Sequence, residues 1–215
     1  MMIDIIYSDD SIVILNKPAG MLSVPGRGPD KQECVSHFIR KKFPLCIQQP
    51  SVHRLDMDTS GLMVFALTTK AHRSLSIQFQ NSEVKKKYIA LLDGTTGGNS
   101  GRIELSFRLD PDNRPRQIFD PIQGKKGITL WKKIKTDCGK TRIEFSPLTG
   151  RTHQLRLHSV HPAGLGCPIA GDRLYGNSSD EKHTAGDRMM LHASELEFTH
   201  PVTGEKMKFS SEPPF

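Results

Sequence analysis

The stretch SVHRLDMDTSGLMVFAL, residues 51–67, places several charged side chains directly before an apolar run. Asp56 and Asp58 stand two positions apart, Arg54 precedes them, and Gly61 opens the run LMVFAL. A continuous apolar run of this length predicts a strand that is buried on both faces. The charged residues therefore stand where a loop enters the core, and such loops commonly carry functional side chains on a rigid support.

The segments around this stretch predict short strands and a few helices. Helical spacing of apolar residues predicts helices over 30–43 and 69–83, and Thr68 or Thr69 is expected to cap the second. A third, short helix is expected in GRTHQLRLHSV, residues 150–160. Strands are expected elsewhere, the first two as a hairpin around the turn SDDS: 3–7, 11–17, 84–94, 101–109, 127–136, 140–147, 189–199 and 205–210.

This mixture predicts an α+β fold, because the chain contains neither a βαβ repeat nor a dinucleotide-binding fingerprint. At 215 residues the chain is long enough for one large domain or for two small halves that share an interface. We expect the glycine-rich segment 94–101 to be the hinge between the halves.

The balance of charge favours a polyanionic partner. The chain has 30 Lys and Arg residues against 23 Asp and Glu, a net charge of +7. No signal peptide is recognisable, and no apolar run is long enough to cross a membrane. The four cysteines have neither disulfide-framework nor zinc-ribbon spacing, so a cytoplasmic protein without membrane partners is expected; they are Cys34, Cys46, Cys138 and Cys167.

Three interpretations of HRLDMDTSG compete. A calcium-binding EF-hand loop fails, because its twelfth position requires a bidentate Glu and Leu67 stands there. A phosphotransferase of the haloacid dehalogenase type is disfavoured, because its apolar strand precedes the first Asp, whereas here the strand follows. The third interpretation takes Arg54 and Asp56 as a working pair, and its ordinary alternative is a structural ion pair.

Two further segments favour the working pair. KKKY, residues 85–88, places an aromatic ring after three lysines, and GRTHQLRLH places Arg151 and Arg156 around a histidine. A carboxylate, an aromatic ring and arginines in a basic chain describe a site for a nucleobase, in which the ring stacks on the base and the carboxylate performs the chemistry.

At this point the sequence resembles the RluA family of pseudouridine synthases, whose catalytic motif is H-R-L-D-x-x-T-S-G. The resemblance runs nearly end to end and ends in LHASELEFTHPVTGE, similar to the family's C-terminal strand pair. Its ordered matches are NKPAGMLSVPG (16–26), HRLDMDTSGL (53–62), KKKYIALLDG (85–94), PLTGRTHQLRLH (147–158) and GCPIAGDRLYG (166–176). The short chain and DPDNRPRQ (110–117) resemble the RluA branch, without the S4-type domain of longer relatives. The sequence departs from the pattern at Cys167, where a histidine is usual, and in an insertion at 159–166.

The resemblance implies a pseudouridine synthase fold over residues 1–215: a mixed, largely antiparallel central sheet with flanking helices and loops, and an active-site cleft between two half-domains. It assigns Asp56 as the catalytic aspartate and Arg156 as the arginine that pairs with it. Arg54 would enter the RNA stack where the target base is flipped out, and Tyr88 would pack on that base. His53, Thr59 and Arg151 are expected among the RNA contacts, whereas Asp58 falls at a variable position.

The implied reaction breaks the N1–C1′ bond of uridine and joins C5 to C1′, so no cofactor is expected. The family uses no metal, and the spacing of His153, His158 and His161 suits no standard zinc site, so these are expected to be structural or phosphate-facing. The expected partners are stem-loops of ribosomal RNA, transfer RNA or both, bound by a monomer. The alternative left open is a non-catalytic RNA-binding protein on the same fold.

Overall fold

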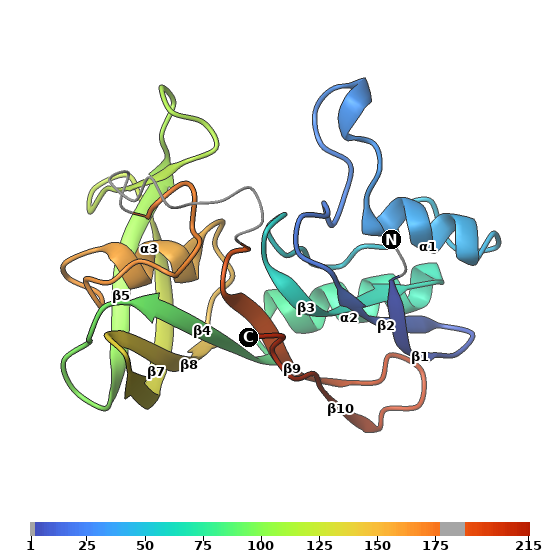
Figure 1. Ribbon diagram of the computed structural model, residues 1–215. Helices are drawn as coiled ribbons and strands as arrows, with labels where there is room; N and C mark the ends of the chain where they lie inside the picture. Colours follow the sequence, from blue (N-terminus) through green and yellow to red (C-terminus); the bar gives the residue numbers. More distant parts are fainter. Residues whose placement is uncertain (1–2, 177–187) are drawn as a thin grey trace. The chain divides into compact units, whose positions relative to one another are not determined.

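The computed structural model describes residues 3–176 and 188–215, which form two compact units (Figure 1). Unit 1 comprises Met1–Lys86 and Ala193–Pro214, and unit 2 comprises Lys87–His192 with Phe215. The chain passes between the units within strands β4 (Lys85–Asp93) and β9 (Leu191–Thr199). The segment 94–101 lies inside unit 2, and its last residues begin a strand, so the expectation that it is the hinge is wrong.

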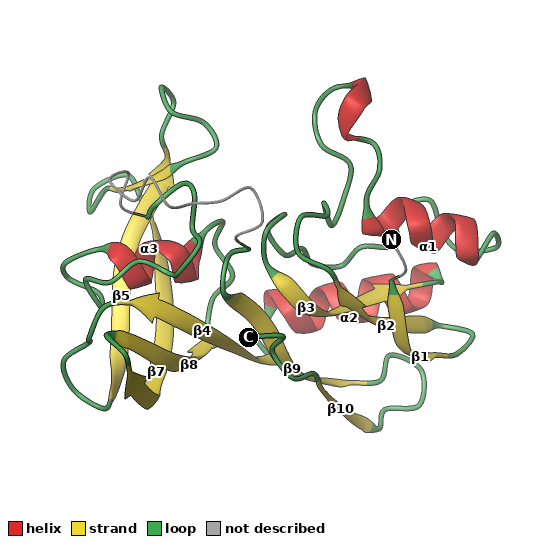
Figure 2. Cartoon of the chain, in the orientation of Figure 1, coloured by secondary structure: helices red, strands yellow, loops and turns green. Residues whose placement is uncertain are grey.

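Strands predominate over helices in both units, as expected for an α+β protein whose named strand pairs are antiparallel (Figure 2). In unit 1 the strand order is β1-β2-β3-β9-β10. The expected hairpin, the apolar strand and both helices are confirmed. The elements of unit 1 besides β9 are β1 (Asp4–Ser8), β2 (Ile12–Lys17), a 3-10 turn (Pro29–Lys31), α1 (Val35–Lys42), β3 (Ser60–Ala66), α2 (Thr69–Gln80) and β10 (Lys206–Ser210).

Strand β3 is buried at every position, so both of its faces are covered. On one face, Leu62 and Val64 pack in a cluster with Ala71 and Leu75 of α2. Helix α2 begins where the sequence predicts, because the Thr68 hydroxyl accepts the backbone N–H of Ala71. This packing anchors the strand that carries the charged loop at its beginning.

Gly61, at the start of β3, occupies a position that admits no side chain. Its φ of +116° is a conformation that residues with a Cβ rarely adopt, and a Cβ there would lie 2.3 Å from the carbonyl oxygen of Ala193 in β9. The glycine that ends the motif is therefore required by the close approach of two strands.

In unit 2 the strand order is β4-β8-β7-β5-β6, and α3 packs on β5 and β7. Leu157 of α3 joins Ile103, Leu105 and Phe107 of β5 in one apolar cluster. Strand β6 was not expected, because three residues are too few to show a strand pattern. The elements are β5 (Ser100–Leu109), β6 (Gln117–Phe119), β7 (Lys125–Asp137), β8 (Lys140–Pro147) and α3 (Gln154–Val160). Within the described ranges, none of the helices has the length and apolar character needed to span a bilayer.

Candidate active site

The loop that carries Asp56 lies in unit 1 and closes on itself before β3 begins. The backbone N–H of Thr59 donates to the Asp56 carbonyl oxygen at 3.2 Å, which closes a turn. The Asp56 and Asp58 side chains are half-buried, whereas Arg54 is exposed. The Arg54 guanidinium has no hydrogen-bond or ion-pair partner among the described residues, so it is available to a ligand.

A second loop, residues 17–23, holds this loop in place through hydrogen bonds. The Lys17 ammonium and the backbone N–H of Gly20 both donate to the Met57 carbonyl oxygen, each at 2.9 Å. The Ser23 hydroxyl donates to the Leu55 carbonyl oxygen and accepts the Leu55 N–H. Asp56 therefore stands between two backbone positions that are each hydrogen-bonded to the same neighbouring loop.

Lys17 is fully buried and donates to three carbonyl oxygens, those of Pro18, Met21 and Met57. No role was expected for Lys17 from the sequence, although a lysine at the end of the apolar strand IVILNK was a signal. A buried ammonium is tolerated only with such hydrogen bonding, and these three carbonyl groups belong to the two loops around Asp56.

We expect Lys17→Met to lower the free energy of unfolding by about 2 kcal/mol or more, because the three charge-assisted hydrogen bonds of the buried ammonium are lost. Urea denaturation followed by circular dichroism measures the change. Lys41→Met, which alters an exposed lysine of α1, is the control and should stay within about 0.5 kcal/mol of the wild type. Equal stability of the two variants would contradict the role of Lys17.

Two residues of the motif that are expected among the RNA contacts also have contacts within the protein. The Nε2 atom of His53 accepts the backbone N–H of Val64 at 3.1 Å, and its ring stacks on Phe79 with centroids 4.6 Å apart. Burial, with a smaller contribution from Lys86, lowers the pKa of His53 to about 3. His53 therefore supports the loop as a neutral ring. Thr59 is only 2% exposed, so its side chain is also part of the support.

The lysine run 85–87 is partly engaged within the protein. Lys85 pairs with Glu197 at 2.9 Å, and Lys87 pairs with Glu144 at 3.5 Å. Burial lowers the pKa of the Lys86 ammonium, which lies 5.9 Å from the centre of the Phe79 ring. Since exposed ion pairs contribute only about 0–1 kcal/mol, RNA phosphates can replace the partners of Lys85 and Lys87.

In unit 2, Arg156 forms a buried, two-pronged ion pair with Asp172. Its Nε and Nη2 atoms donate to the two carboxylate oxygens at 2.7 and 2.6 Å, and both side chains are at most 3% exposed. Asp172 also accepts the backbone N–H groups of Leu174 and Tyr175. The guanidinium lies 5.1 Å from the Tyr175 ring centre. The orientation of Arg156 is thus set within unit 2, by residues of GCPIAGDRLYG that the sequence analysis did not single out.

The histidine and glutamine before Arg156 also hold this helix in place. Tyr175 Oη accepts the backbone N–H of Gln117 and lies 2.8 Å from His153 Nδ1. Buried Gln154 bonds to β7 and accepts the backbone N–H of Arg151. The Arg151 side chain is exposed, and its Nε donates to the Lys126 carbonyl oxygen.

The expectation that His153 is structural agrees with this geometry. His158 is fully buried as well, and burial lowers its pKa to about 4.

The side chain of Tyr88 is half-buried and packs against the core cluster of unit 2. Among the described residues, no three His, Cys, Asp or Glu side chains converge as metal ligands would.

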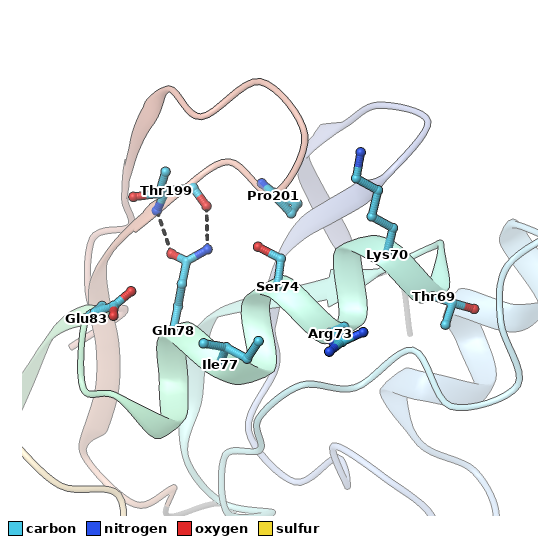
Figure 3. A pocket seen from close by; sticks show the side chains of 9 residues that line it. All are labelled: Thr69, Lys70, Arg73, Ser74, Ile77, Gln78, Glu83, Thr199 and Pro201. Atoms are coloured by element: carbon cyan, nitrogen blue, oxygen red, sulfur yellow. Dashed lines mark hydrogen bonds between the residues drawn. The ribbon is translucent and has the colours of Figure 1, made fainter.

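A groove of about 670 Å³ lies elsewhere in unit 1, along α2 between Thr69 and Gln78 and beside Thr199 and Pro201 (Figure 3). Gln78 lines the groove; its side-chain amide donates to the Thr199 carbonyl oxygen and accepts the Thr199 backbone N–H, at 2.8 Å each (Figure 3). None of the residues that the sequence analysis placed in the site lines this groove. We assign no chemical step to it.

Comparison with known proteins identifies the family. A family model described as RNA pseudouridylate synthase matches residues 11–161, a range that includes Asp56, Tyr88 and Arg156. The chain belongs to the RNA pseudouridylate synthase family. The resemblance recognised in the sequence is thereby confirmed.

Relatives within the family match over nearly their whole length. The dual-specificity RNA pseudouridine synthase RluA of Haemophilus influenzae is 42% identical over 99% of this chain and 94% of its own. The protein of the same name from Escherichia coli is 41% identical over 96% of this chain and 91% of its own. The structure of human RNA pseudouridylate synthase domain containing 1 superposes with a TM-score of 0.78 at 28% identity, covering 100% of this chain and 84% of that one.

These matches confirm the pseudouridine synthase fold and favour a catalytic protein over a non-catalytic RNA-binding one. The members of this family are isomerases that convert uridine to pseudouridine within RNA. Only the motif distinguishes Asp56, at its aspartate position, from Asp58, at a variable position.

Proposed function

We propose that this protein isomerises uridine to pseudouridine in RNA stem-loops, with Asp56 as the essential carboxylate. The observation that carries the proposal is the similarity to dual-specificity pseudouridine synthases over nearly the full chain, including the complete motif around Asp56. The support of the Asp56 turn by Lys17 and Ser23 agrees with it, because a catalytic group must be held in a defined position.

The reaction rearranges one nucleotide without adding atoms to it. The N1–C1′ bond breaks, the uracil turns, and C5 bonds to C1′, while C5 loses a proton to solvent and N1 ends with one. Asp56 would act beside the ribose, either as a nucleophile at C1′ or as the base at the 2′ position. Both roles need an ionised carboxylate, which is the ordinary state of aspartate at neutral pH.

The target base must leave its stack before any of these bonds can change, at a cost of a few kcal/mol. The exposed Arg54 guanidinium is suited to filling the vacated space, since it is planar and has no partner in the described part of the chain. Tyr88 is assigned to packing on the flipped base, and Arg151 to a phosphate. The pairing of Arg156 with Asp56 stays a prediction beside its contact with Asp172.

The proposed targets are a loop of 23S ribosomal RNA and the transfer RNA anticodon loop. The name of the relatives, which describes a dual specificity, supports two kinds of substrate. Unpaired loop bases are also those that a protein can turn out and stack at the lowest cost. We further propose that residues 1–215 act as one catalytic domain, in a cytoplasmic monomer.

Isolated stem-loops from both RNAs are expected to be substrates without ribosomal proteins or the remainder of either RNA. A local loop should carry most of the recognition, because a chain of 215 residues can contact only a short piece of RNA. Release of tritium from C5-labelled uridine measures the conversion of each stem-loop.

The matched control is each stem-loop with its target uridine replaced by cytidine, which should release no tritium from the remaining labelled uridines. If both stem-loops stay unmodified while assembled ribosomal particles are converted, recognition by the local loop is wrong.

A further inference from the structure

An aromatic pair lies on the surface of unit 2, where the insertion at 159–166 meets β6. The rings of Phe119 and His161 have centroids 4.7 Å apart and planes inclined by 44°. Phe119 is 42% exposed although it is a large apolar side chain, and His161 is half-buried. His153 and His158 are buried, so His161 differs from the other two histidines of this segment in remaining accessible.

Hydrogen bonds on both sides hold this pair in place. His161 continues α3 through its backbone N–H, which donates to Leu157, and its Nδ1 accepts the N–H of Ala163. After Phe119, the Asp120 carboxylate accepts from Arg108 Nε at 2.6 Å and from two backbone N–H groups of the following turn. The two rings are therefore held in position by the protein, so a ligand that binds them does not pay the entropic cost of ordering them.

Cationic side chains without partners stand in the same hairpin. Arg114 and Arg116 lie in the loop between β5 and β6 and are exposed. Neither guanidinium has a hydrogen bond or ion pair within residues 3–176 and 188–215. Exposed aromatic rings beside free arginines are the combination with which proteins bind single-stranded nucleic acid, since the rings stack on bases and the arginines neutralise phosphates.

Contacts within unit 2 link the Phe119–His161 pair to Arg156. Arg156 lies against the Tyr175 ring, and Tyr175 Oη accepts the backbone N–H of Gln117. Gln117 and Phe119 are alternate residues of β6, so their side chains leave the same face of the strand, roughly 7 Å apart. His161 follows directly after the helix that carries Arg156. The aromatic pair thus stands close to a residue assigned to the uridine site.

We propose that Phe119 and His161 form a stacking platform for a second, unpaired base of the RNA loop, with Arg114 and Arg116 on the adjoining phosphates. This inference rests on the proposed function, which supplies RNA as the ligand. It gives the insertion at 159–166 a role: the insertion supplies one of the two rings. A protein partner is the less favoured occupant, because the four side chains combine π-faces with positive charge.

Fluorescence anisotropy of labelled stem-loops tests the platform through binding, independently of conversion. Phe119→Ala and His161→Ala are each expected to weaken binding about tenfold, the effect of losing one base–aromatic stack. The value of kcat at saturating RNA should stay unchanged. A 2-aminopurine placed at successive loop positions should be quenched by the wild type at one position, and Phe119→Ala should remove that quenching.

Two controls separate stacking from general surface effects. Phe119→Tyr keeps an aromatic ring and should bind as the wild type does. Ile122→Ala removes an apolar side chain that lies in the turn after β6 and is 91% exposed, and it should leave both affinity and quenching unchanged.

Unchanged affinity and quenching in Phe119→Ala would overturn the platform and leave these rings to a protein partner. Equal weakening by Ile122→Ala would overturn it as well. If the wild type converts neither stem-loop but Phe119→Ala still weakens binding, the proposed function fails and the platform stands. If the wild type converts the stem-loops and Phe119→Ala binds them as well as the wild type does, the proposed function stands and the platform fails.

Discussion

The Asp56→Asn variant is expected to lose isomerisation by about 10³-fold or more while still folding and binding RNA. Asparagine has nearly the same shape as aspartate, so the turn closed by the Asp56 carbonyl oxygen and the Thr59 N–H should persist. What the variant lacks is the negative charge, which is needed either to attack C1′ or to remove the 2′ proton. The loss should therefore appear in kcat.

Asp58→Asn is the matched control for this experiment. Asp58 stands two positions away in the same loop and is also half-buried, but it falls at a variable position of the motif. This variant should retain most of the wild-type rate. Tritium release at saturating stem-loop measures both variants, and anisotropy verifies that Asp56→Asn still binds. An equally severe loss of rate in the two variants would refute the assignment of Asp56.

The Asp172→Ala variant is expected to lose about 3–5 kcal/mol of unfolding free energy. The pair with Arg156 is almost completely buried, so removing the carboxylate takes two charge-assisted hydrogen bonds away from a guanidinium in the interior of unit 2. It also leaves the backbone N–H groups of Leu174 and Tyr175 without their acceptor. For a protein of this size, the melting temperature should fall by about 10 °C.

The exposed pair of Lys85 and Glu197 provides the comparison, since its lysine side chain is 74% exposed. Glu197→Gln should change the unfolding free energy by no more than about 1 kcal/mol. Thermal and urea denaturation measure both variants. A melting temperature of Asp172→Ala within a degree or two of the wild type would show that the buried pair contributes little.

Much of the fold could be predicted because local patterns agree with the final structure. The apolar run before Thr68 became the buried strand β3, and Thr68 caps α2 as its position suggested. The two errors, the missed strand β6 and the expected hinge at 94–101, arose because a short segment does not show what it pairs with in space. The three residues of β6 are defined by pairing with β5, and the glycines of 94–101 resemble a hinge although the chain changes unit at β4 and β9.

The candidate site was predicted only in part. Asp56, Arg54 and Arg156 were singled out by their charge pattern, and the family resemblance then gave each a role. The structure leaves Arg54 exposed, which agrees with its proposed role. His53 and Thr59 were assigned to RNA, and the structure adds that they also support the loop from within. Nothing in the sequence distinguishes a motif residue that faces the substrate from one that faces the core.

By itself, the sequence determined the family and the α+β class, and it named the residue proposed to carry the chemistry, because these depend on residue identity and spacing along the chain. Only the tertiary structure decided which side chains hold the candidate site residues in place. Lys17 reaches Met57 across 40 positions, and Arg156 reaches Asp172 across 16. Such partners follow from packing in space: a buried charge needs hydrogen-bond partners, and folding brings them together from distant parts of the chain.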